Sequence, residues 1–362
     1  MTAVMDTQGG DLRYLPGESL LDLGTCVNLY GPPPSVRAAL RSIDPGRILA
    51  HPYGCEEAFT AAYAGFMGTT PDLLVPGRGI TEFIRVLAQI LPARQVAVIT
   101  PDYTDTIRCF PTHLPPPAGV TETVDTRLTR VAQAMGTHPY VILSNPNNPL
   151  GLYLHRDRLI EICRAHPESV LIVDEAYIEF LPGFTELSMV RSGLPNVVVL
   201  RSPNKFFGIA GTRTGALWTR NAAIARRVAE RKLNWTLSYV DTVLATAALA
   251  DTTWAGQTRD ALLRNAAELT DLLAGRFPGL AGNVPVHFRF IAVDDPLAGH
   301  RFFLRHGVAV RAFDGHQAGR ISGLRVTAPT ARQLAALKAS IAGHGASQTD
   351  ERARRQRCPI PS

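Results

Sequence analysis

Short apolar runs alternate with helix-like segments through the middle of this chain of 362 residues. Four runs rich in Val, Ile and Leu cover residues 96–100, 140–143, 170–173 and 197–200. Residues 128–135 and 157–165, which lie between these runs, have the apolar spacing of amphipathic helices. Buried strands that alternate with helices are typical of a parallel sheet covered on both faces. The pattern therefore predicts an α/β fold with a mostly parallel central sheet flanked by helices.

A different pattern begins after about residue 250. A long helix-like segment at residues 258–273 is followed by strand-like pieces and a final helix at residues 330–341. Such a mixed ending predicts a smaller α+β domain at the C-terminal end. We therefore expect four parts: an N-terminal arm with part of the small domain (1–44), a large domain (45–250), a small C-terminal domain (251–343) and a disordered tail (344–362).

Several classes of protein are excluded by the composition. No apolar run approaches the ~18 residues of a membrane-spanning helix, and residues 1–11 do not resemble a secretory signal. The five cysteines are scattered and show no CxxC spacing, which argues against a disulfide framework and a zinc site. We expect a cytoplasmic protein with no metal and no membrane partner.

The formal net charge of +6 does not indicate a nucleic-acid partner. Most basic residues are spread along the chain, and the dense cluster at residues 352–357 lies in a tail rich in polar residues. Such a tail is typical of a solvated, disordered segment. Mild basicity also suits a protein that binds anionic small molecules.

Lys205 follows directly after the apolar run at residues 197–200. A lysine just beyond a buried strand can become a desolvated, reactive amine. Arg213 follows eight residues later beside glycines, where its guanidinium could hold a phosphate group. An amine and a phosphate clamp together suggest a Schiff base with pyridoxal 5'-phosphate, although a surface lysine after a strand would give the same local pattern.

Other polar residues follow the ends of the same predicted strands, which is where open α/β sheets bind ligands. Asp174 ends an apolar run, and a buried carboxylate there calls for a cationic partner such as a protonated pyridine nitrogen. Asn148 lies in a turn with two prolines. Tyr103 follows another strand, and residues 77–82 join a turn to a helix-like stretch whose free N–H groups could bind phosphate.

In this order, these motifs resemble the fold-type I pyridoxal-phosphate enzymes of the class I/II aminotransferase superfamily. Within that superfamily, the chain is most similar to the histidinol-phosphate aminotransferase and threonine-phosphate decarboxylase group, from Gly9 to about Ala342. The resemblance implies that Lys205 forms the Schiff base and moves the proton at Cα. It also implies that Asp174 pairs with the pyridine nitrogen, while Asn148 and Tyr177 bond to the ring hydroxyl.

The resemblance assigns further residues to the cofactor and to the substrate. It implies that Tyr103 stacks on the ring and that Arg325 binds the substrate α-carboxylate. The expected phosphate ligands are Gly79, Ile80, Thr81, Ser202, Asn204 and Arg213. The other expected substrate contacts are Gln8, Asn28, Tyr30 and Trp235. The family's homodimer implies that His51 or Tyr53 reaches the cofactor of the neighbouring subunit.

Several departures from the group leave the reaction open. Gln8 replaces a histidine of the decarboxylases, and Ala328 and Pro329 follow the carboxylate arginine where a second arginine is usual. We expect an aminotransferase that acts on an amino acid in a specialised biosynthetic pathway. A decarboxylase of the threonine-phosphate type and a pyridoxal-phosphate-dependent amino-acid oxidase are the alternatives.

Two other classes of function fit the sequence less well. Ser202 and Lys205 match the S-x-x-K signature of serine β-lactamases, but the chain contains no Lys-Thr-Gly and Pro203 lies between the two residues. A non-catalytic sensor built on the same fold is disfavoured because Lys205, Asp174 and Arg325 are all retained.

Overall fold

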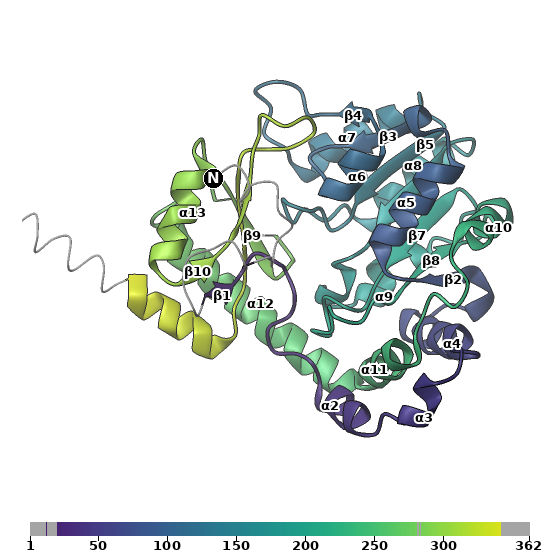
Figure 1. Cartoon of the computed structure of the whole chain (residues 1–362). Coiled ribbons are helices and arrows are strands. Elements are labelled where there is room, and N and C mark those ends of the chain that lie inside the picture. Colours follow the sequence, from purple (N-terminus) through teal and green to yellow (C-terminus); the bar gives the residue numbers. More distant parts are fainter. Residues whose placement is uncertain (1–11, 13–19, 281, 283, 342–362) are drawn as a thin grey trace, which may run out of the picture.

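A seven-stranded sheet forms the centre of the larger lobe in this computed structural model (Figure 1). The structure describes residues 12, 20–280, 282 and 284–341. In spatial order the strands are β2 (Leu74–Gly77), β8 (Gly215–Thr219), β7 (Val197–Arg201), β6 (Val170–Asp174), β5 (Tyr140–Ser144), β3 (Val96–Ile99) and β4 (Thr112–Leu114). Strand β8 runs antiparallel to both neighbours, and the pairs from β7 to β4 are parallel. The mostly parallel sheet predicted from the sequence is confirmed.

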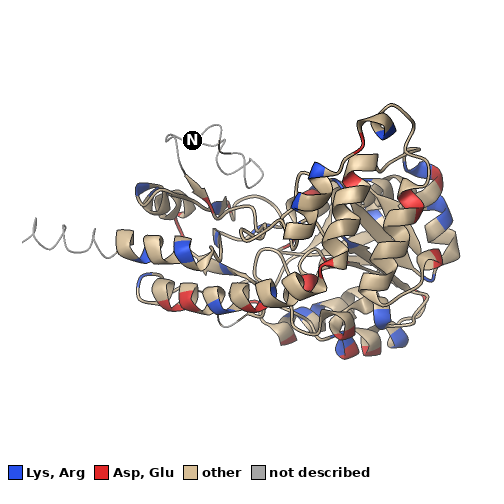
Figure 2. Ribbon diagram, turned by 90° about the horizontal axis from the view of Figure 1, so that it is seen from below, with Lys and Arg blue, Asp and Glu red and all other residues tan. Residues whose placement is uncertain are grey.

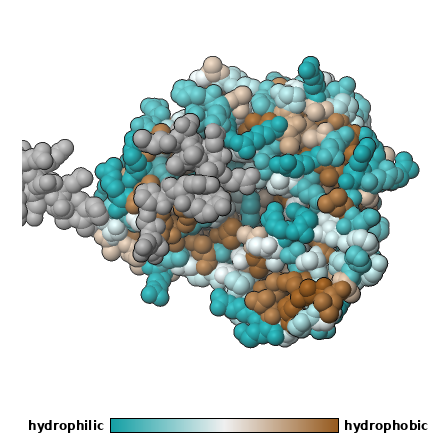
Figure 3. All heavy atoms as spheres, viewed as in Figure 1, coloured by the Kyte–Doolittle hydropathy of each residue, from teal (hydrophilic) through white to brown (hydrophobic). Residues whose placement is uncertain are grey.

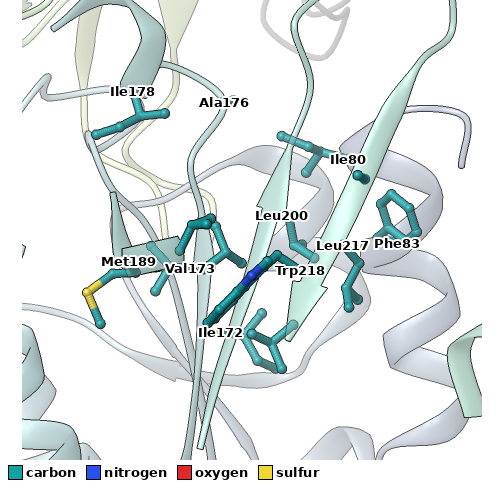
Figure 4. Packing of buried hydrophobic residues seen from close by; sticks show 14 of the residues in the cluster. Ile80, Phe83, Ile172, Val173, Ala176, Ile178, Met189, Leu200, Leu217 and Trp218 are labelled. Carbon is teal, nitrogen blue, oxygen red and sulfur yellow. The ribbon is translucent and has the colours of Figure 1, made fainter. Parts of the chain in front are cut away.

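Amphipathic helices cover this sheet. Helix α5 buries Ile80, Phe83, Ile84 and Leu87, which share one face because of their i, i+3, i+4, i+7 spacing. Figure 4 shows Ile80 and Phe83 in one layer with Leu200 of β7 and Leu217 of β8. The helices of this lobe include α4 (Cys55–Met67), α5 (Ile80–Ile90), α6 (Thr104–Cys109), α7 (Val124–Met135), α8 (Arg156–Ala165), α9 (Phe184–Leu187) and α10 (Ala222–Arg231).

Strands β2 and β8 were not predicted, because glycine and proline at their ends favour turns. Gly215 begins β8 where two backbones come very close. A Cβ at this position would lie 2.8 Å from the carbonyl oxygen of Arg201 and 2.8 Å from the Cα of Gly79. The glycine that made the segment look like a turn is thus what allows the strand to enter the sheet.

The smaller lobe contains an antiparallel sheet of β11 (Arg311–Phe313), β12 (Gly323–Thr327) and β9 (Phe288–Ala292). The N-terminal segment joins this lobe, since β1 (Leu21–Asp22) pairs in parallel with β10 (Val308–Ala309). The lobe has its own hydrophobic cluster, as expected for the predicted small domain. Its helices are α13 (Pro296–Arg305), part of the long α12 (Thr252–Ala274) and a helix at residues 331–341.

The hairpin of β11 and β12 also touches the larger lobe. Gly319, in the loop between the two strands, has a φ of +75°. A Cβ at Gly319 would lie 3.1 Å from Thr100 and 3.3 Å from the His113 ring. The tip of the hairpin therefore packs on the larger lobe close to the end of β3.

At the other end of the molecule, α2 (Pro34–Arg41) and α3 (Pro45–Ile48) pack on α11 (Tyr239–Ala250), as Figure 1 shows. Figure 2 shows basic and acidic residues interspersed along the helices. Among the described helices, none is long and apolar enough to cross a membrane. The basic cluster at residues 352–357 lies outside the described residues.

Candidate active site

A cavity of about 220 Å³ lies where strands β5, β6 and β7 end. Its walls come from both lobes, because Arg311 and Arg325 of the small-lobe hairpin line it together with residues of the central sheet. Parallel strands direct their carboxyl ends to the same edge of a sheet, which explains why residues distant in sequence meet here. Of the residues predicted for the site, the cavity is lined by Gly79, Ile80, Thr81, Tyr103, Asn148, Asp174, Tyr177, Ser202, Asn204, Lys205, Arg213 and Arg325.

Lys205 follows β7 and directs its amine into this cavity. The Nζ atom donates a hydrogen bond of 2.9 Å to Tyr177 Oη and lies 5.9 Å from the centre of the Tyr103 ring. Burial lowers the pKa of the Lys205 amine below its usual range. A larger share of the amine is therefore uncharged, which is the form that attacks a carbonyl carbon.

Asp174 is the last residue of β6 and is 3% exposed. Its Oδ1 atom accepts a hydrogen bond from the Ala176 N–H at 2.9 Å. Burial raises the pKa of Asp174 to about 7, and the positive charge of Lys205 opposes the rise. A carboxylate in this environment would be stabilised by a cation that binds in the cavity.

The start of α5 lines the cavity together with Ser202 and Arg213, which follow β7. Gly79 is the N-cap of α5 with a φ of +80°, and a Cβ there would lie 3.3 Å from an Arg213 guanidinium nitrogen. The first N–H groups of a helix have no partner within the helix. With the exposed Arg213 beside them, they form an arrangement suited to a phosphate group. Ser202 also lines the cavity, but its hydroxyl donates to the Thr214 carbonyl oxygen at 2.7 Å, so its expected phosphate contact stays a prediction.

Arg325 lies on β12 and is 6% exposed. One terminal guanidinium nitrogen donates to Asn148 Oδ1 and the other to the carbonyl oxygen of Gly24 at 2.8 Å. Within the described part of the chain, the buried Nε atom has no hydrogen-bond partner. This guanidinium is thus held in place with donor capacity left over, as binding of an anion would require.

Arg311 is a cavity residue that we did not predict. It lies on β11 directly opposite Arg325 in the antiparallel register, and it also lines the cavity. Directly opposite residues on one face of a sheet are about 4.5–5.5 Å apart at Cβ. Arg311 lies within the predicted strand 308–313, but its pairing with Arg325 depends on the fold and could not be seen in the sequence.

Cys26 and His287 lie behind Tyr177 and were also not predicted. Burial raises the pKa of the Tyr177 hydroxyl well above its usual range, and the nearby Cys26 side chain adds to the rise. The His287 ring stacks on Phe180 with 3.5 Å between ring centres, and its Nε2 lies 3.1 Å from the Cys26 carbonyl oxygen. The His287 ring also packs beside Tyr177, with 5.9 Å between ring centres.

Some predicted residues lie elsewhere. Asn28 is buried. Its side-chain amide donates a hydrogen bond to the Phe206 carbonyl oxygen and accepts one from the Tyr30 N–H. The Tyr30 hydroxyl accepts hydrogen bonds from Asn265 and Ala331. Gln8 lies outside the described residues. The direct substrate contacts expected for these residues stay predictions.

A second group of predicted residues forms an aromatic cluster on the surface. The rings of His51 and Trp235 stack with 4.3 Å between centres, and Tyr53 meets Trp235 edge to face at 6.1 Å. None of the three lines the 220 Å³ cavity. Within one chain these residues do not reach the site, so a cofactor contact would require a second subunit.

Asn204 is at the cavity, but its amide is engaged within the protein. Its Nδ2 donates to the Thr212 carbonyl oxygen, and its Oδ1 accepts from the Thr214 hydroxyl at 2.8 Å. The phosphate contact expected for Asn204 stays a prediction. No group of three or more His, Cys, Asp or Glu residues that could hold a metal ion occurs in the described part of the chain.

Comparison with protein families identifies the group to which this site belongs. The sequence pattern of aminotransferases of class I and II matches residues 18–336. The chain is a member of this family. The match includes every predicted site residue except Gln8, which precedes it.

Curated relatives of this aminotransferase-family chain include two aminotransferases with different substrates in their names. A histidinol-phosphate aminotransferase of Moorella thermoacetica is 30% identical over 337 residues, covering 89% of this chain and 84% of the relative. An aromatic amino acid aminotransferase of Cutibacterium acnes is 34% identical over 214 residues, covering 55% of this chain and 58% of the relative.

Solved structures share the fold. Histidinol-phosphate aminotransferase of Sinorhizobium meliloti, solved in complex with pyridoxal-5'-phosphate, superposes with a TM-score of 0.77 at 22% identity, covering 93% of this chain and 94% of that one. L-threonine-O-3-phosphate decarboxylase of Porphyromonas gingivalis superposes with a TM-score of 0.72 at 17% identity, covering 89% and 98%. These superpositions confirm the predicted fold, and the family match confirms the predicted class: a pyridoxal-phosphate-dependent, aminotransferase-like enzyme.

Proposed function

We propose that this protein is an aminotransferase that acts on the α-carbon of an amino acid through Lys205. The observation that carries the proposal is the position of the Lys205 amine, 2.9 Å from Tyr177 Oη in a cavity shared with Asp174 and Arg325. A reactive amine, a buried carboxylate and a fixed guanidinium are the groups needed to bind pyridoxal phosphate and an amino acid together.

The residues around the cavity fit pyridoxal 5'-phosphate. Its phosphate would be held by the Gly79–Thr81 backbone, Ser202 and Arg213. Asp174 would pair with the protonated ring nitrogen, which explains why a buried carboxylate faces the cavity. When bound, this cofactor withdraws electrons from the bond that breaks at Cα.

Lys205 has two tasks in this proposal. The uncharged amine favoured by burial would be the group that holds the cofactor through its aldehyde carbon. With an amino acid bound, the same Nζ atom would accept the proton from Cα. The Tyr177 hydroxyl, at hydrogen-bond distance from Nζ, orients the amine for both tasks.

Arg325 and Arg311 suggest how an amino acid is held. Arg325, fixed by Asn148 and Gly24, would bind the α-carboxylate through Nε and a terminal nitrogen. Arg311, opposite it on β11, would favour a substrate whose side chain carries a second acidic group. The α-carboxylate contact decides which bond at Cα aligns with the cofactor ring, and hence which reaction follows.

The two arginines should respond differently to substitution. We expect Arg325→Lys to raise KM about 10–100-fold for every amino acid tested, because lysine cannot form the paired hydrogen bonds. Arg311→Lys, its matched control, should raise KM chiefly for substrates with an acidic side chain. Steady-state kinetics on acidic and neutral amino acids would check this, and equal effects of both variants on all substrates would contradict the assignment.

The reaction itself can be tested with a panel of amino acids. The purified enzyme is supplied with pyridoxal phosphate and a keto-acid acceptor, and keto acid, carbon dioxide and hydrogen peroxide are measured. Keto acid without peroxide supports the proposal. Carbon dioxide as the main product would replace it with decarboxylation, and peroxide would replace it with oxidation.

We also propose that the protein is a homodimer. The exposed large apolar residues at the surface formed by α2, α3 and the segment after α10 include Leu49, which is 90% exposed, together with Leu40, Ile48, Tyr53, Leu233 and Trp235. Figure 3 shows a hydrophobic area over α11 and the neighbouring α2 and α3. Clustered exposed apolar residues are typical of a protein interface. A second copy would cover them and bring the cluster of His51, Tyr53 and Trp235 towards its cavity.

A charged side chain introduced into this apolar surface should weaken the dimer. Leu49→Asp should shift the protein from dimer to monomer in sedimentation experiments and lower its activity at least about tenfold, because burying an unpaired carboxylate costs several kcal/mol. Val120→Asp is the matched control, since Val120 is also an exposed apolar residue (42%) but lies between β4 and α7. A fully active wild-type monomer would refute the proposed dimer.

A reducing compartment such as the cytoplasm would suit this chain. The described cysteines Cys26, Cys55, Cys109 and Cys163 are free thiols. Reduced cysteines are usual for proteins of that compartment. Fractionation of cells that produce the protein would test this placement.

A further inference from the structure

A buried ion pair next to the cavity has no role in the function proposed above. Arg127 of α7 donates to Asp102 Oδ2 at 2.9 Å, and both side chains are fully buried. The same guanidinium donates to the carbonyl oxygens of Ile99 and Pro101. Burying two charges costs free energy that their attraction does not always recover, so the pair calls for an explanation.

The Asp102 carboxylate joins two segments that carry cavity residues. Its Oδ1 atom accepts from the Tyr103 N–H at 2.7 Å. Its Oδ2 atom accepts from the N–H and the hydroxyl of Ser144, at 2.8 and 3.0 Å. The Ser144 hydroxyl oxygen in turn accepts from the Asn148 N–H at 3.0 Å. One carboxylate therefore connects the segment with Tyr103 to the turn with Asn148.

Arg127 fixes the carboxylate relative to the sheet. Because its guanidinium also bonds to Ile99, the last residue of β3, and to Pro101, Asp102 cannot shift without breaking several hydrogen bonds. The negative charge of Asp102 also reaches the cofactor site, since burial raises the pKa of Asp174 and Asp102 adds to the rise.

We propose that Asp102, held by Arg127, is a positioning residue that sets the Tyr103 ring and the Asn148 amide against the ring of the bound cofactor. The inference rests on the proposed function, in which those two residues meet that ring. The phosphate end is built from the Gly79–Thr81 backbone, Ser202 and Arg213, none of which bonds to Asp102 in the described structure. The Thr81 hydroxyl lies 3.4 Å from Tyr103 Oη, but this contact involves the side chain and leaves the backbone N–H groups unchanged. The effect of Asp102 is thus confined to the ring end of the cavity.

The test compares ligands that occupy the two ends of the cavity. Dissociation constants of pyridoxal, pyridoxal phosphate and inorganic phosphate are measured on the full-length protein after removal of cofactor. Asp102→Asn should weaken pyridoxal binding about tenfold, the effect of losing charge-assisted hydrogen bonds. Phosphate binding should stay within about twofold of wild type, because the phosphate end keeps its contacts.

A second variant covers the case in which Asp102→Asn does not fold. Ser144→Ala removes the hydroxyl that links Asp102 to Asn148 and leaves the Asp102–Arg127 pair intact. It should weaken pyridoxal binding in the same direction by about threefold to fivefold.

Asn196→Ala is the matched control for loss of stability. Asn196 is buried and also joins several segments, because its amide donates to the carbonyl oxygens of Cys163, His166 and Ser169. It precedes β7 and therefore lies at the opposite edge of the same sheet. This variant should lower the melting temperature without changing the ratio of pyridoxal to phosphate affinity.

The outcomes separate the inference from the function on which it rests. The positioning role would be overturned if Asp102→Asn and Ser144→Ala bound pyridoxal and phosphate equally more weakly, or if neither variant bound pyridoxal more weakly. Wild-type transamination would stand in both cases. Pyridoxal affinity that falls alone in both variants supports the role. A wild type that forms no keto acid would refute the proposed function instead, and the binding ratios would still decide the role of Asp102.

Discussion

Lys205→Ala should abolish transamination, with kcat reduced by about 10⁴-fold or more. The variant loses the amine that binds the cofactor covalently and the base that moves the Cα proton, and each of these tasks contributes a large factor to the rate. Borohydride treatment should attach the cofactor permanently to wild-type protein at Lys205, as peptide mass spectrometry would show, and should leave the variant unmodified.

Two further substitutions make this result specific. Lys205→Arg keeps a positive charge near Asp174 but cannot form the covalent bond, so it should be as inactive as Lys205→Ala. Lys338→Ala removes a surface lysine that pairs with Glu268 and should keep wild-type activity. A Lys205→Ala enzyme within tenfold of wild-type kcat would refute the proposed role of this lysine.

Asp174→Asn should have the second largest effect, with a loss of activity of about 10²–10³-fold. The asparagine amide has nearly the same shape as the carboxylate but does not stabilise a protonated ring nitrogen. Removing one partner of a buried charge pair costs about 3–5 kcal/mol, and the lower part of that range corresponds to this loss of rate. Asp174→Glu, which keeps the charge, should recover part of the activity; if Asp174→Asn were fully active, the proposed pairing would be wrong.

The same variant should change how the stability of the cofactor-free protein depends on pH. Burial raises the folded-state pKa of Asp174 to about 7, above the value of about 3.9 in an unfolded chain. Protonated Asp174 therefore contributes stability to the folded state that is fully present below about pH 4 and is lost as the pH rises through about 7. The shift of about three pKa units corresponds to about 4 kcal/mol.

Urea denaturation between pH 4 and 8 would measure this dependence. The free energy of unfolding of cofactor-free wild type should fall more steeply with rising pH than that of Asp174→Asn. Pyridoxal phosphate should restore more stability to wild type at pH 8 than to the variant, because its ring nitrogen supplies the missing cation. Parallel pH profiles for the two proteins would contradict a raised pKa at Asp174.

The central sheet could be predicted from the sequence because its inner strands are short apolar runs. Strands β5, β6 and β7 begin at the predicted residues and extend one residue further, to Ser144, Asp174 and Arg201. A polar residue at the end of an apolar run does not indicate a buried strand. These three residues are buried because other parts of the fold cover them. Strand β8 could not be predicted, because the close backbone contact that requires Gly215 is a tertiary feature.

Site residues that belong to a local sequence motif could be predicted. Lys205, Asp174 and Asn148 each follow an apolar strand, and the structure brings them to one cavity. Arg311 and Asp102 were missed because their significance depends on partners distant in sequence, Arg325 across a hairpin and Ser144 on another strand. Motif spacing along one segment carries no information about such pairs.

The hairpin of β11 and β12 has one more consequence. Arg311 and Arg325 are paired in register on the same two strands, and the hairpin tip at Gly319 rests on the larger lobe. Strand pairing therefore sets the spacing of the two arginines at the backbone, while Asn148 of the larger lobe and the Gly24 carbonyl oxygen hold the Arg325 guanidinium. In the proposed function, this spacing would favour a substrate whose two acidic groups are a matching distance apart.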